Sequence, residues 1–226
     1  MLMEKERNDI VEFGKQMSSQ GLSKGTSGNL SCYDPETGYM AIGPSSLGYF
    51  DTTPEDIVIM DLEGNIIEGK RKPSSEHNLH ATVYKHHPEA RAVVHTHSTY
   101  CTTFACLRQP LKAVHYVISG AGVDEVPCAE YATFGTPELA ENVGKAMGES
   151  KALLLANHGL VTCGLSMAKA FSLAVNMEFV AEMQWRCMAV GAPVVLTGEE
   201  MAAVRVRMQS YGQAKKPGEP KDTVGY

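Results

Sequence analysis

The sequence AVVHTH at residues 92–97 places two histidines at the end of a short apolar segment. Its β-branched residues predict a buried strand over Ala92 to His95. Because side chains alternate between the two faces of a strand, His95 and His97 point the same way. Two imidazoles on one face provide half of a metal site, although such a pair also occurs as histidines held in ordinary hydrogen bonds.

A third histidine follows another predicted strand, over Ala152 to Asn157. His158 comes at the end of this apolar segment, where site residues commonly project, although a histidine before a glycine is also an ordinary turn residue. Catalytic zinc commonly takes three protein ligands and leaves one position open. His95, His97 and His158 would supply those three, and the other histidines of the sequence have no comparable spacing.

Three short polar segments could hold an anion. PSSEH at residues 73–77 puts two hydroxyls and an acidic residue at the start of a predicted helix, where backbone N–H groups are exposed. An N-cap is the ordinary interpretation of such serines. GTSGN at residues 25–29 and GPSS at 43–46 allow close backbone approach to an anion, but each also fits a tight turn. Neither is a Walker motif or a G-x-G-x-x-G sequence.

Strands and helices alternate along the chain, with some strands in antiparallel-looking runs. Further strands are predicted at 30–33, 39–42 and 57–62, and a turn at 63–65 leads into a strand at 66–67. Helices are predicted at 4–20, from Ser74 or Ser75 to about residue 87, from Ser98 or Thr99 onward, at 166–190 and at 199–210. This order favours an α/β fold: a single-domain three-layer sandwich with a central, mostly antiparallel or mixed β-sheet flanked by helices. We expect one domain over residues 1–212 and a polar, weakly ordered tail over 213–226.

Composition excludes several classes of protein. The chain carries 20 basic and 26 acidic residues, a net charge of −6, which provides no electrostatic surface for nucleic acid or an anionic membrane. No stretch approaches the roughly 20 apolar residues of a membrane span, and the N-terminus lacks the apolar region of a signal peptide. The 6 scattered cysteines indicate reduced thiols. We therefore expect a cytoplasmic protein.

Seven segments together resemble one family. They are GLSKGTSGNLS, KPSSE, AVVHTHS, AVHYVISGAG, VPCAEYATFGTPELAENV, LLLANHGL and SYG, and they extend from Gly21 to Gly212. They resemble the class II (zinc-dependent) sugar-phosphate aldolase and epimerase family, and within it the bacterial L-fuculose-1-phosphate aldolases. The resemblance implies a class II aldolase/adducin-like fold over residues 1–212, one Zn²⁺ per subunit (with Mn²⁺ or Co²⁺ as alternatives), and a homotetramer with active sites between subunits.

The resemblance also implies the site residues. The implied metal ligands are Glu76, His95, His97 and His158, and the implied phosphate pocket consists of Gly28, Asn29, Ser45, Ser46, Ser74 and Ser75. Glu76 would also be the catalytic base. Tyr116 would reach into the neighbouring subunit's site as proton donor, although a buried core residue is the ordinary interpretation of a tyrosine in this apolar segment. Phe134 and Tyr211 would line the aldehyde pocket.

The implied activity is metal-dependent retro-aldol cleavage of a ketose 1-phosphate, such as L-fuculose 1-phosphate, to dihydroxyacetone phosphate and a short aldehyde such as L-lactaldehyde. An aldolase for 5-deoxypentulose or methylthioribulose 1-phosphate is the first alternative. Pentulose-phosphate 4-epimerases are a further alternative, but their sequences resemble Ser-Ser-Asp at the position where this chain has Ser-Ser-Glu. A methylthioribulose-phosphate dehydratase is a more distant relation. A non-enzymatic module like the adducin head would be favoured by loss of the metal ligands, and all four are present. The chain departs from the fuculose enzymes at Ser45-Ser46, where they have Thr-Gly, and at Met208, where they have phenylalanine.

Overall fold

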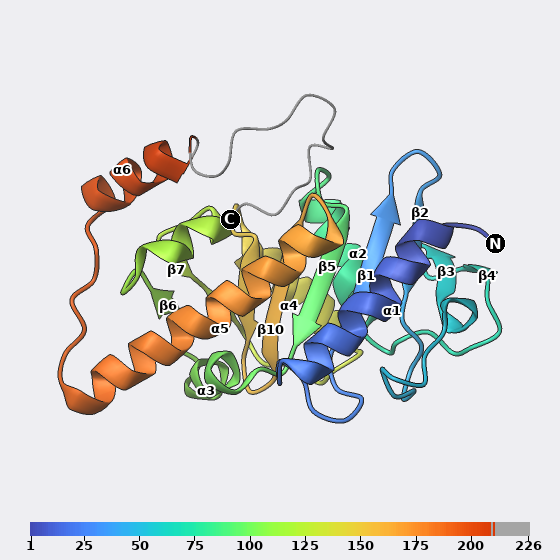
Figure 1. The fold of residues 1–226 in the computed structure, drawn as a ribbon, viewed down its shortest axis with the longest axis horizontal. Helices are drawn as coiled ribbons and strands as arrows, with labels where there is room; N and C mark the ends of the chain where they lie inside the picture. Colours follow the sequence, from blue (N-terminus) through green and yellow to red (C-terminus); the bar gives the residue numbers. More distant parts are fainter. Residues whose placement is uncertain (209, 211–226) are drawn as a thin grey trace.

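The computed structural model describes residues 1–208 and 210 (Figure 1). Its centre is an eight-stranded sheet in the order β4-β3-β2-β1-β5-β10-β9-β8. The strands are β1 (Asn29–Asp34), β2 (Tyr39–Ile42), β3 (Val58–Asp61), β4 (Ile66–Glu68), β5 (Ala92–Thr96), β8 (Cys128–Ala129), β9 (Ala152–Leu155) and β10 (Gly159–Gly164). Neighbours are antiparallel except β8 and β9, which are parallel. Strands β6 (Leu111–Lys112) and β7 (Glu125–Val126) pair separately.

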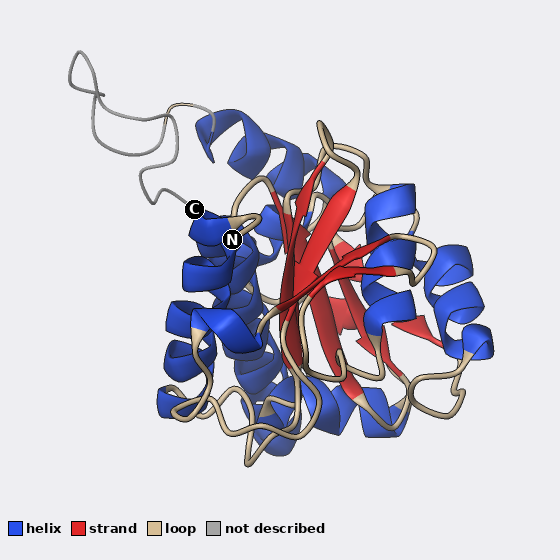
Figure 2. Ribbon diagram, turned by 90° about the vertical axis from the view of Figure 1, so that its right-hand side faces the viewer, coloured by secondary structure: helices blue, strands red, loops and turns tan. Residues whose placement is uncertain are grey.

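Helices cover both faces of the sheet (Figure 2). One core contains residues of α1 (Glu4–Ser19), α3 (Thr99–Leu107) and α5 (Met167–Val190), and the other contains residues of α2 (His77–His86) and α4 (Pro137–Met147). The chain also forms α6 (Gly198–Met208) and the 3₁₀ helices η1 (Pro54–Asp56) and η2 (Tyr116–Ala121). The predicted α/β sandwich with a mixed central sheet is confirmed. The predicted domain boundary at 212 and the predicted tail over 213–226 lie outside the described residues.

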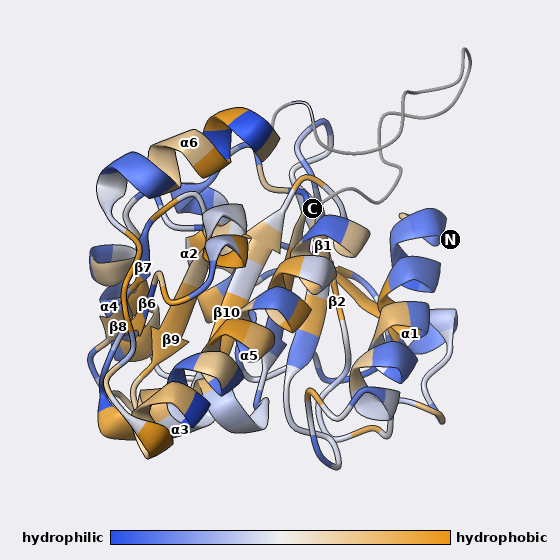
Figure 3. Cartoon of the chain, turned by 60° about the vertical axis from the view of Figure 1, so that its left-hand side comes forward, coloured by the Kyte–Doolittle hydropathy of each residue, from blue (hydrophilic) through white to orange (hydrophobic). Residues whose placement is uncertain are grey.

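The alternation of side chains decides which strand residues face α2. Leu30 and Val94 lie in the core shared with α1 and α5, so their sequence neighbours on β1 and β5 face the opposite side. Asn29 of β1 lies directly beside His95 of β5 in the register, and both point toward the α2 side. Figure 3 shows β9 as an apolar strand, which agrees with its position inside the sheet. The polar residues therefore gather where the central strands end.

Some elements differ from the sequence-based expectations. The helix predicted from Ser74 or Ser75 begins at His77, with Glu76 as its N-cap and no side-chain cap. The reason is that Ser74 is held in an extended pairing, with its N–H donating to the Gly43 carbonyl at 3.0 Å. The sequence-based prediction also omitted α4 and β10. Among the described helices, none is both long and apolar enough to cross a membrane.

A buried arginine ties the first helix to the edge of the sheet. The Arg7 side chain is 2% exposed, and its Nε donates to the Leu2 carbonyl at 2.7 Å. Its Nη1 donates to the carbonyls of Pro54 and Ile57 at 3.0 and 2.6 Å, and its Nη2 pairs with Glu68 at 2.7 Å. One guanidinium therefore satisfies acceptors from three separate segments.

We predict that Arg7→Ala lowers the free energy of unfolding by roughly 2–4 kcal/mol, because buried carbonyls lose their donor and a void remains. The matched control is Arg71→Ala: Arg71 also pairs with an acid, Asp56, at 2.7 Å, but its side chain is 55% exposed. That variant should lose only about 0–1 kcal/mol. Urea denaturation of both variants measures the difference, and equal losses would contradict the structural role of Arg7.

Candidate active site

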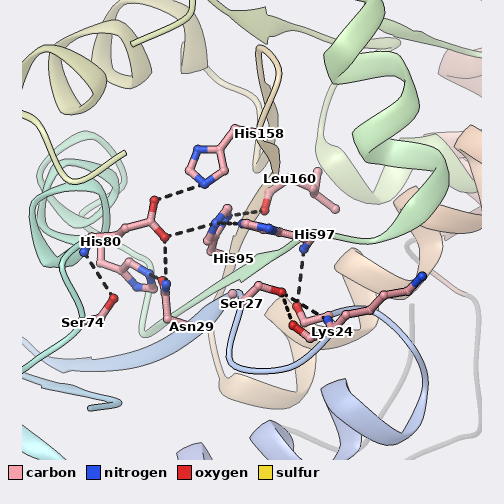
Figure 4. Close-up of polar contacts among 12 residues, drawn as sticks. Lys24, Ser27, Asn29, Ser74, His80, His95, His97, His158 and Leu160 are labelled. Carbon is pink, nitrogen blue, oxygen red and sulfur yellow. Dashed lines mark hydrogen bonds and ion pairs between the residues drawn. The ribbon is translucent and has the colours of Figure 1, made fainter. Parts of the chain in front are cut away.

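Three histidines converge at one end of β5 and β10 (Figure 4). The ring centroids of His95, His97 and His158 lie 4.9, 4.8 and 4.9 Å apart, with the ring planes close to perpendicular at 71°, 72° and 83°. One ligand atom from each ring lies within 4.8 Å of the others. His158 comes from the turn between β9 and β10, where Asn157 adopts a φ of +53°. The three predicted ligands are thus brought together from two distant segments.

These imidazoles are held neutral, with one nitrogen directed inward. His95 Nδ1 lies 2.9 Å from the Leu160 carbonyl, which can only accept, so Nδ1 carries the hydrogen and Nε2 has the free lone pair. Burial lowers the pKa of His95 and His97 and lowers that of His158 to about 4. Neutral imidazole is the form that binds metal ions.

Glu76 closes the fourth side of this cluster. Its Oε2 lies 3.3 Å from His95 Nε2 and accepts from Asn29 Nδ2 at 2.9 Å, while its Oε1 lies 3.3 Å from His158 Nε2. Burial raises the pKa of the Glu76 carboxyl, but the polar surroundings formed by His95, His158 and the Asn29 hydrogen bond together hold it below its usual value. The carboxylate is therefore ionised at neutral pH.

The donor set fits a cation. His95 Nε2, which carries no hydrogen, lies 3.3 Å from a Glu76 carboxylate oxygen, so two acceptors face each other there, and the same nitrogen lies 3.0 Å from His97 Nε2. Among the described residues, no hydrogen-bond donor reaches the buried Glu76 Oε1. A metal ion between the three rings and this carboxylate would satisfy all of these lone pairs.

Two glycines allow the segments to approach this closely. A Cβ at Gly159 would lie 2.3 Å from the Thr96 carbonyl oxygen, so a side chain there would separate β10 from β5. Gly28 has a φ of +75°, and a Cβ there would lie 2.7 Å from the His95 carbonyl oxygen. Both glycines are therefore required by packing against the strand that carries the histidines.

A cleft of about 340 Å³ opens beside the cluster. It is lined by the six residues predicted for phosphate, Gly28, Asn29, Ser45, Ser46, Ser74 and Ser75, together with Glu76, His97, His158 and Phe134. Residues that were not among the individually predicted site residues also line it: Thr26, Ser27, Pro44, Tyr131, Ala132 and Asn157. None of these described lining residues is lysine or arginine, so an anion would meet hydroxyls, an amide and backbone groups.

The two serine pairs are held side by side by backbone hydrogen bonds. Ser45 N–H donates to the Lys72 carbonyl at 2.9 Å, in addition to the bond from Ser74 to Gly43. Ser46 has a φ of +59°, a conformation that costs a residue other than glycine about 1 kcal/mol or more. Glycine would avoid this strain, so Ser46 provides its hydroxyl at the cost of backbone strain.

Of the residues predicted for the aldehyde end and the proton donor, Phe134 lies at the cleft and Tyr116 lies away from it. Phe134 is 66% exposed at the cleft, and Tyr211 is outside the described residues. Tyr116, at the start of η2, is 48% exposed, which makes its interpretation as a core residue wrong. It lines a separate cavity of about 360 Å³ with Arg207 and Met208 instead of the cleft of its own chain.

One buried residue next to the site escaped the sequence analysis. His80 Nε2 lies 2.5 Å from Asn29 Oδ1, and Nδ1 lies 2.6 Å from Ser31 Oγ. Burial lowers the pKa of His80 to about 3, so the ring is neutral. The spacing of Glu76, His80 and Tyr84, four residues apart on one helix, was the available signal.

Comparison with known proteins identifies the family. The model of the class II aldolase and adducin N-terminal domain matches residues 8–185. The 5-deoxy-D-ribulose 1-phosphate aldolase of Bacillus thuringiensis is 45% identical over 213 residues, covering 94% of this chain and 100% of that protein. The L-fuculose phosphate aldolase of Escherichia coli O157:H7 is 41% identical over 204 residues, covering 90% and 94%.

Comparison with solved structures identifies the same family. A solved structure of an L-fuculose 1-phosphate aldolase matches with a TM-score of 0.89 at 41% identity, covering 92% of this chain and 98% of that one. Because its relatives are aldolases over nearly their whole length, the chain belongs to the class II aldolase and adducin N-terminal domain family as an aldolase, a carbon–carbon lyase.

Proposed function

We propose that this aldolase cleaves a ketose 1-phosphate to dihydroxyacetone phosphate and a short aldehyde. The observation that carries the proposal is the arrangement of three neutral imidazoles and Glu76 beside a cleft lined with hydroxyls. The three histidines would hold a divalent ion, Zn²⁺ in our proposal with Mn²⁺ or Co²⁺ as alternatives, and Glu76 would add a carboxylate oxygen. Once bound, the ion would stabilise the negative charge that develops on the substrate oxygens during cleavage.

Glu76 is the group placed to move the proton. When the C3–C4 bond of the ketose breaks, the C4 hydroxyl loses a proton and C3 later gains one. Asn29 holds Glu76 Oε2 at 2.9 Å, whereas no described donor reaches Oε1. Oε1 is therefore the oxygen that would carry the proton between these atoms.

The serine pairs and Asn29 would bind the phosphate. Ser45, Ser46, Ser74 and Ser75 lie on two loops joined by backbone hydrogen bonds, so their hydroxyls are fixed relative to the histidines. The phosphate does not change during the reaction, so these contacts would position the substrate. Phe134, and Tyr211 by resemblance, would contact the aldehyde end.

Two substrates are supported by particular relatives. L-fuculose 1-phosphate, which would give L-lactaldehyde, agrees with the matched fuculose enzymes at 41% identity. A 5-deoxyribulose 1-phosphate agrees with the Bacillus thuringiensis relative at 45% identity. Both would give dihydroxyacetone phosphate, so the choice affects only the aldehyde end of the cleft.

We also propose that the enzyme is a homotetramer in which Tyr116 serves the neighbouring subunit. The support is its exposure, 48%, and its position in a cavity separate from the cleft of its own chain. There its hydroxyl would hydrogen-bond to the C4 oxygen, which becomes the aldehyde oxygen, and would relay its proton toward Glu76, which delivers it to C3.

We predict that the enzyme releases dihydroxyacetone phosphate from L-fuculose 1-phosphate, 5-deoxyribulose 1-phosphate or both. A coupled assay that reduces dihydroxyacetone phosphate measures each substrate. Elemental analysis should find about one divalent ion per chain, and chelation should abolish activity until the metal is restored. Full activity in a preparation free of metal, or no cleavage of any ketose 1-phosphate, would refute the proposal.

Glu76→Gln should reduce kcat by roughly 10²- to 10⁴-fold, because the amide keeps the size of the side chain but cannot act as a base. Substrate binding should change less, so KM reports whether the cleft is intact. The control is Glu141→Gln, which removes an exposed carboxylate paired with Lys145 at 2.7 Å. Wild-type turnover in the Glu76 variant would show that its carboxylate is only structural.

Tyr116→Phe should keep the assembly and the melting temperature but slow cleavage strongly, because only a hydroxyl is removed. Mixing Tyr116→Phe chains with Glu76→Gln chains then tests where the hydroxyl acts. If each site takes its tyrosine from another subunit, co-refolded hybrids contain sites in which both residues are intact, and activity returns. Hybrids verified by mass spectrometry that stay inactive would show that Tyr116 does not serve a neighbouring site.

A further inference from the structure

A chain of four hydrogen bonds leads from the interior of the protein to Glu76, and Figure 4 shows the part of it around His80 and Asn29. The distances are 2.8 Å from Tyr84 Oη to Ser31 Oγ, 2.6 Å from Ser31 Oγ to His80 Nδ1, 2.5 Å from His80 Nε2 to Asn29 Oδ1, and 2.9 Å from Asn29 Nδ2 to Glu76 Oε2. The implied site residues include only the last two members of this chain. The other three side chains are therefore unexplained by the proposed function.

The direction of every bond follows from the carboxylate. An ionised Glu76 only accepts, so the NH₂ group of Asn29 must face it, and the Asn29 oxygen must face His80. That oxygen also only accepts, so His80 carries its hydrogen on Nε2. His80 Nδ1 is then an acceptor, which makes Ser31 its donor and leaves Tyr84 to donate to Ser31. All four hydrogens point toward Glu76.

Burial makes any other arrangement costly. Ser31 and His80 are 0% exposed and Tyr84 is 2% exposed, so water cannot replace a lost partner. Rotating the Asn29 amide by 180° would place its oxygen against the Glu76 carboxylate and its NH₂ against the His80 N–H. Two favourable contacts would become two repulsive ones, and a buried polar group left without a partner is costly.

We propose that His80, oriented by Ser31 and Tyr84, is a positioning residue that fixes the Asn29 amide so that it donates to Glu76. This inference rests on the proposed function, in which Glu76 transfers the proton. With Oε2 held by Asn29, the carboxylate keeps one orientation, and Oε1 is directed toward the histidines and the cleft. His80 does not line the cleft, and among the proposed phosphate groups it contacts only Asn29, so it acts only through Asn29.

The first test needs no substrate. Protein with ¹⁵N-labelled histidine, freed of metal, is measured at pH 7.5 by two-bond ¹⁵N–¹H correlation, and the His80 signals are assigned as those missing from His80→Gln. The expected result is a neutral ring with hydrogen on Nε2 and none on Nδ1. Hydrogen on Nδ1, or on both nitrogens, would overturn the proposed direction of the chain.

The second test separates positioning from stability. His80→Leu removes both hydrogen-bonding nitrogens, and its kcat should fall roughly 10- to 100-fold, the loss typical of residues that support a metal ligand. KM should change less than kcat, because the four serines would still hold the phosphate. His80→Gln keeps an acceptor and a donor joined through one carbon, like the N–C–N edge of the ring, and should recover most of the rate.

Leu79→Ala is the matched control, because Leu79 is a buried neighbour on α2 that packs in the core and takes no part in the chain. It should lower the melting temperature while kcat stays near the wild-type value. A loss of kcat in His80→Leu no larger than in Leu79→Ala, or equal losses in His80→Leu and His80→Gln, would overturn the proposal. If His80→Leu does not fold, the tautomer measurement on the wild-type protein still decides.

The two proposals fail in different ways. If the wild-type enzyme cleaves no ketose 1-phosphate, the proposed function is wrong whatever tautomer His80 has. If the wild-type enzyme is active and His80 has the other tautomer, the proposed function stands and the positioning role is wrong.

Discussion

Helix α2 packs along the face of β1, and the repeats of the two elements nearly match in length. Two residues of a strand span about 6.8 Å, and four residues of a helix span about 6.0 Å. Asn29, Ser31 and Tyr33 on the strand therefore meet Glu76, His80 and Tyr84 on the helix one after another. The last pair stacks with ring centroids 5.0 Å apart. The position of Glu76 relative to the histidines depends on this packing.

The cleft has no basic side chain among its described lining residues. The protein carries a net charge of −6, and the cleft lining that the structure describes includes neither lysine nor arginine. In the proposed function, binding of a sugar phosphate here would depend on oriented hydroxyls, an amide and the backbone, and on the charge of an ion at the histidines. A site of this kind selects by geometry more than by long-range attraction, because fixed dipoles act only over short distances.

Much of the fold and of the histidine cluster could be predicted from the sequence. The alternation of a strand already placed His95 and His97 on one face, and His158 followed a second apolar segment. The order of strands and helices predicted the layered fold. His80 was missed because a histidine on a helix becomes informative only when the opposite strand is known. The start of α2 was misplaced because Ser74 pairs with Gly43, a long-range contact that local capping rules do not include.

Strand β5 lies between β1 and β10, and both partners are far away in sequence. The amides near His95 can exchange their hydrogens with solvent only when one of these pairings opens, and the whole core separates with them. We therefore place His95 in the most slowly exchanging unit of the fold, whereas Phe134, at the rim of the cleft, is exposed. The stability of the sheet thus makes this part of the site rigid. Substitutions at the rim of the cleft can change which aldehyde is bound without weakening the sheet.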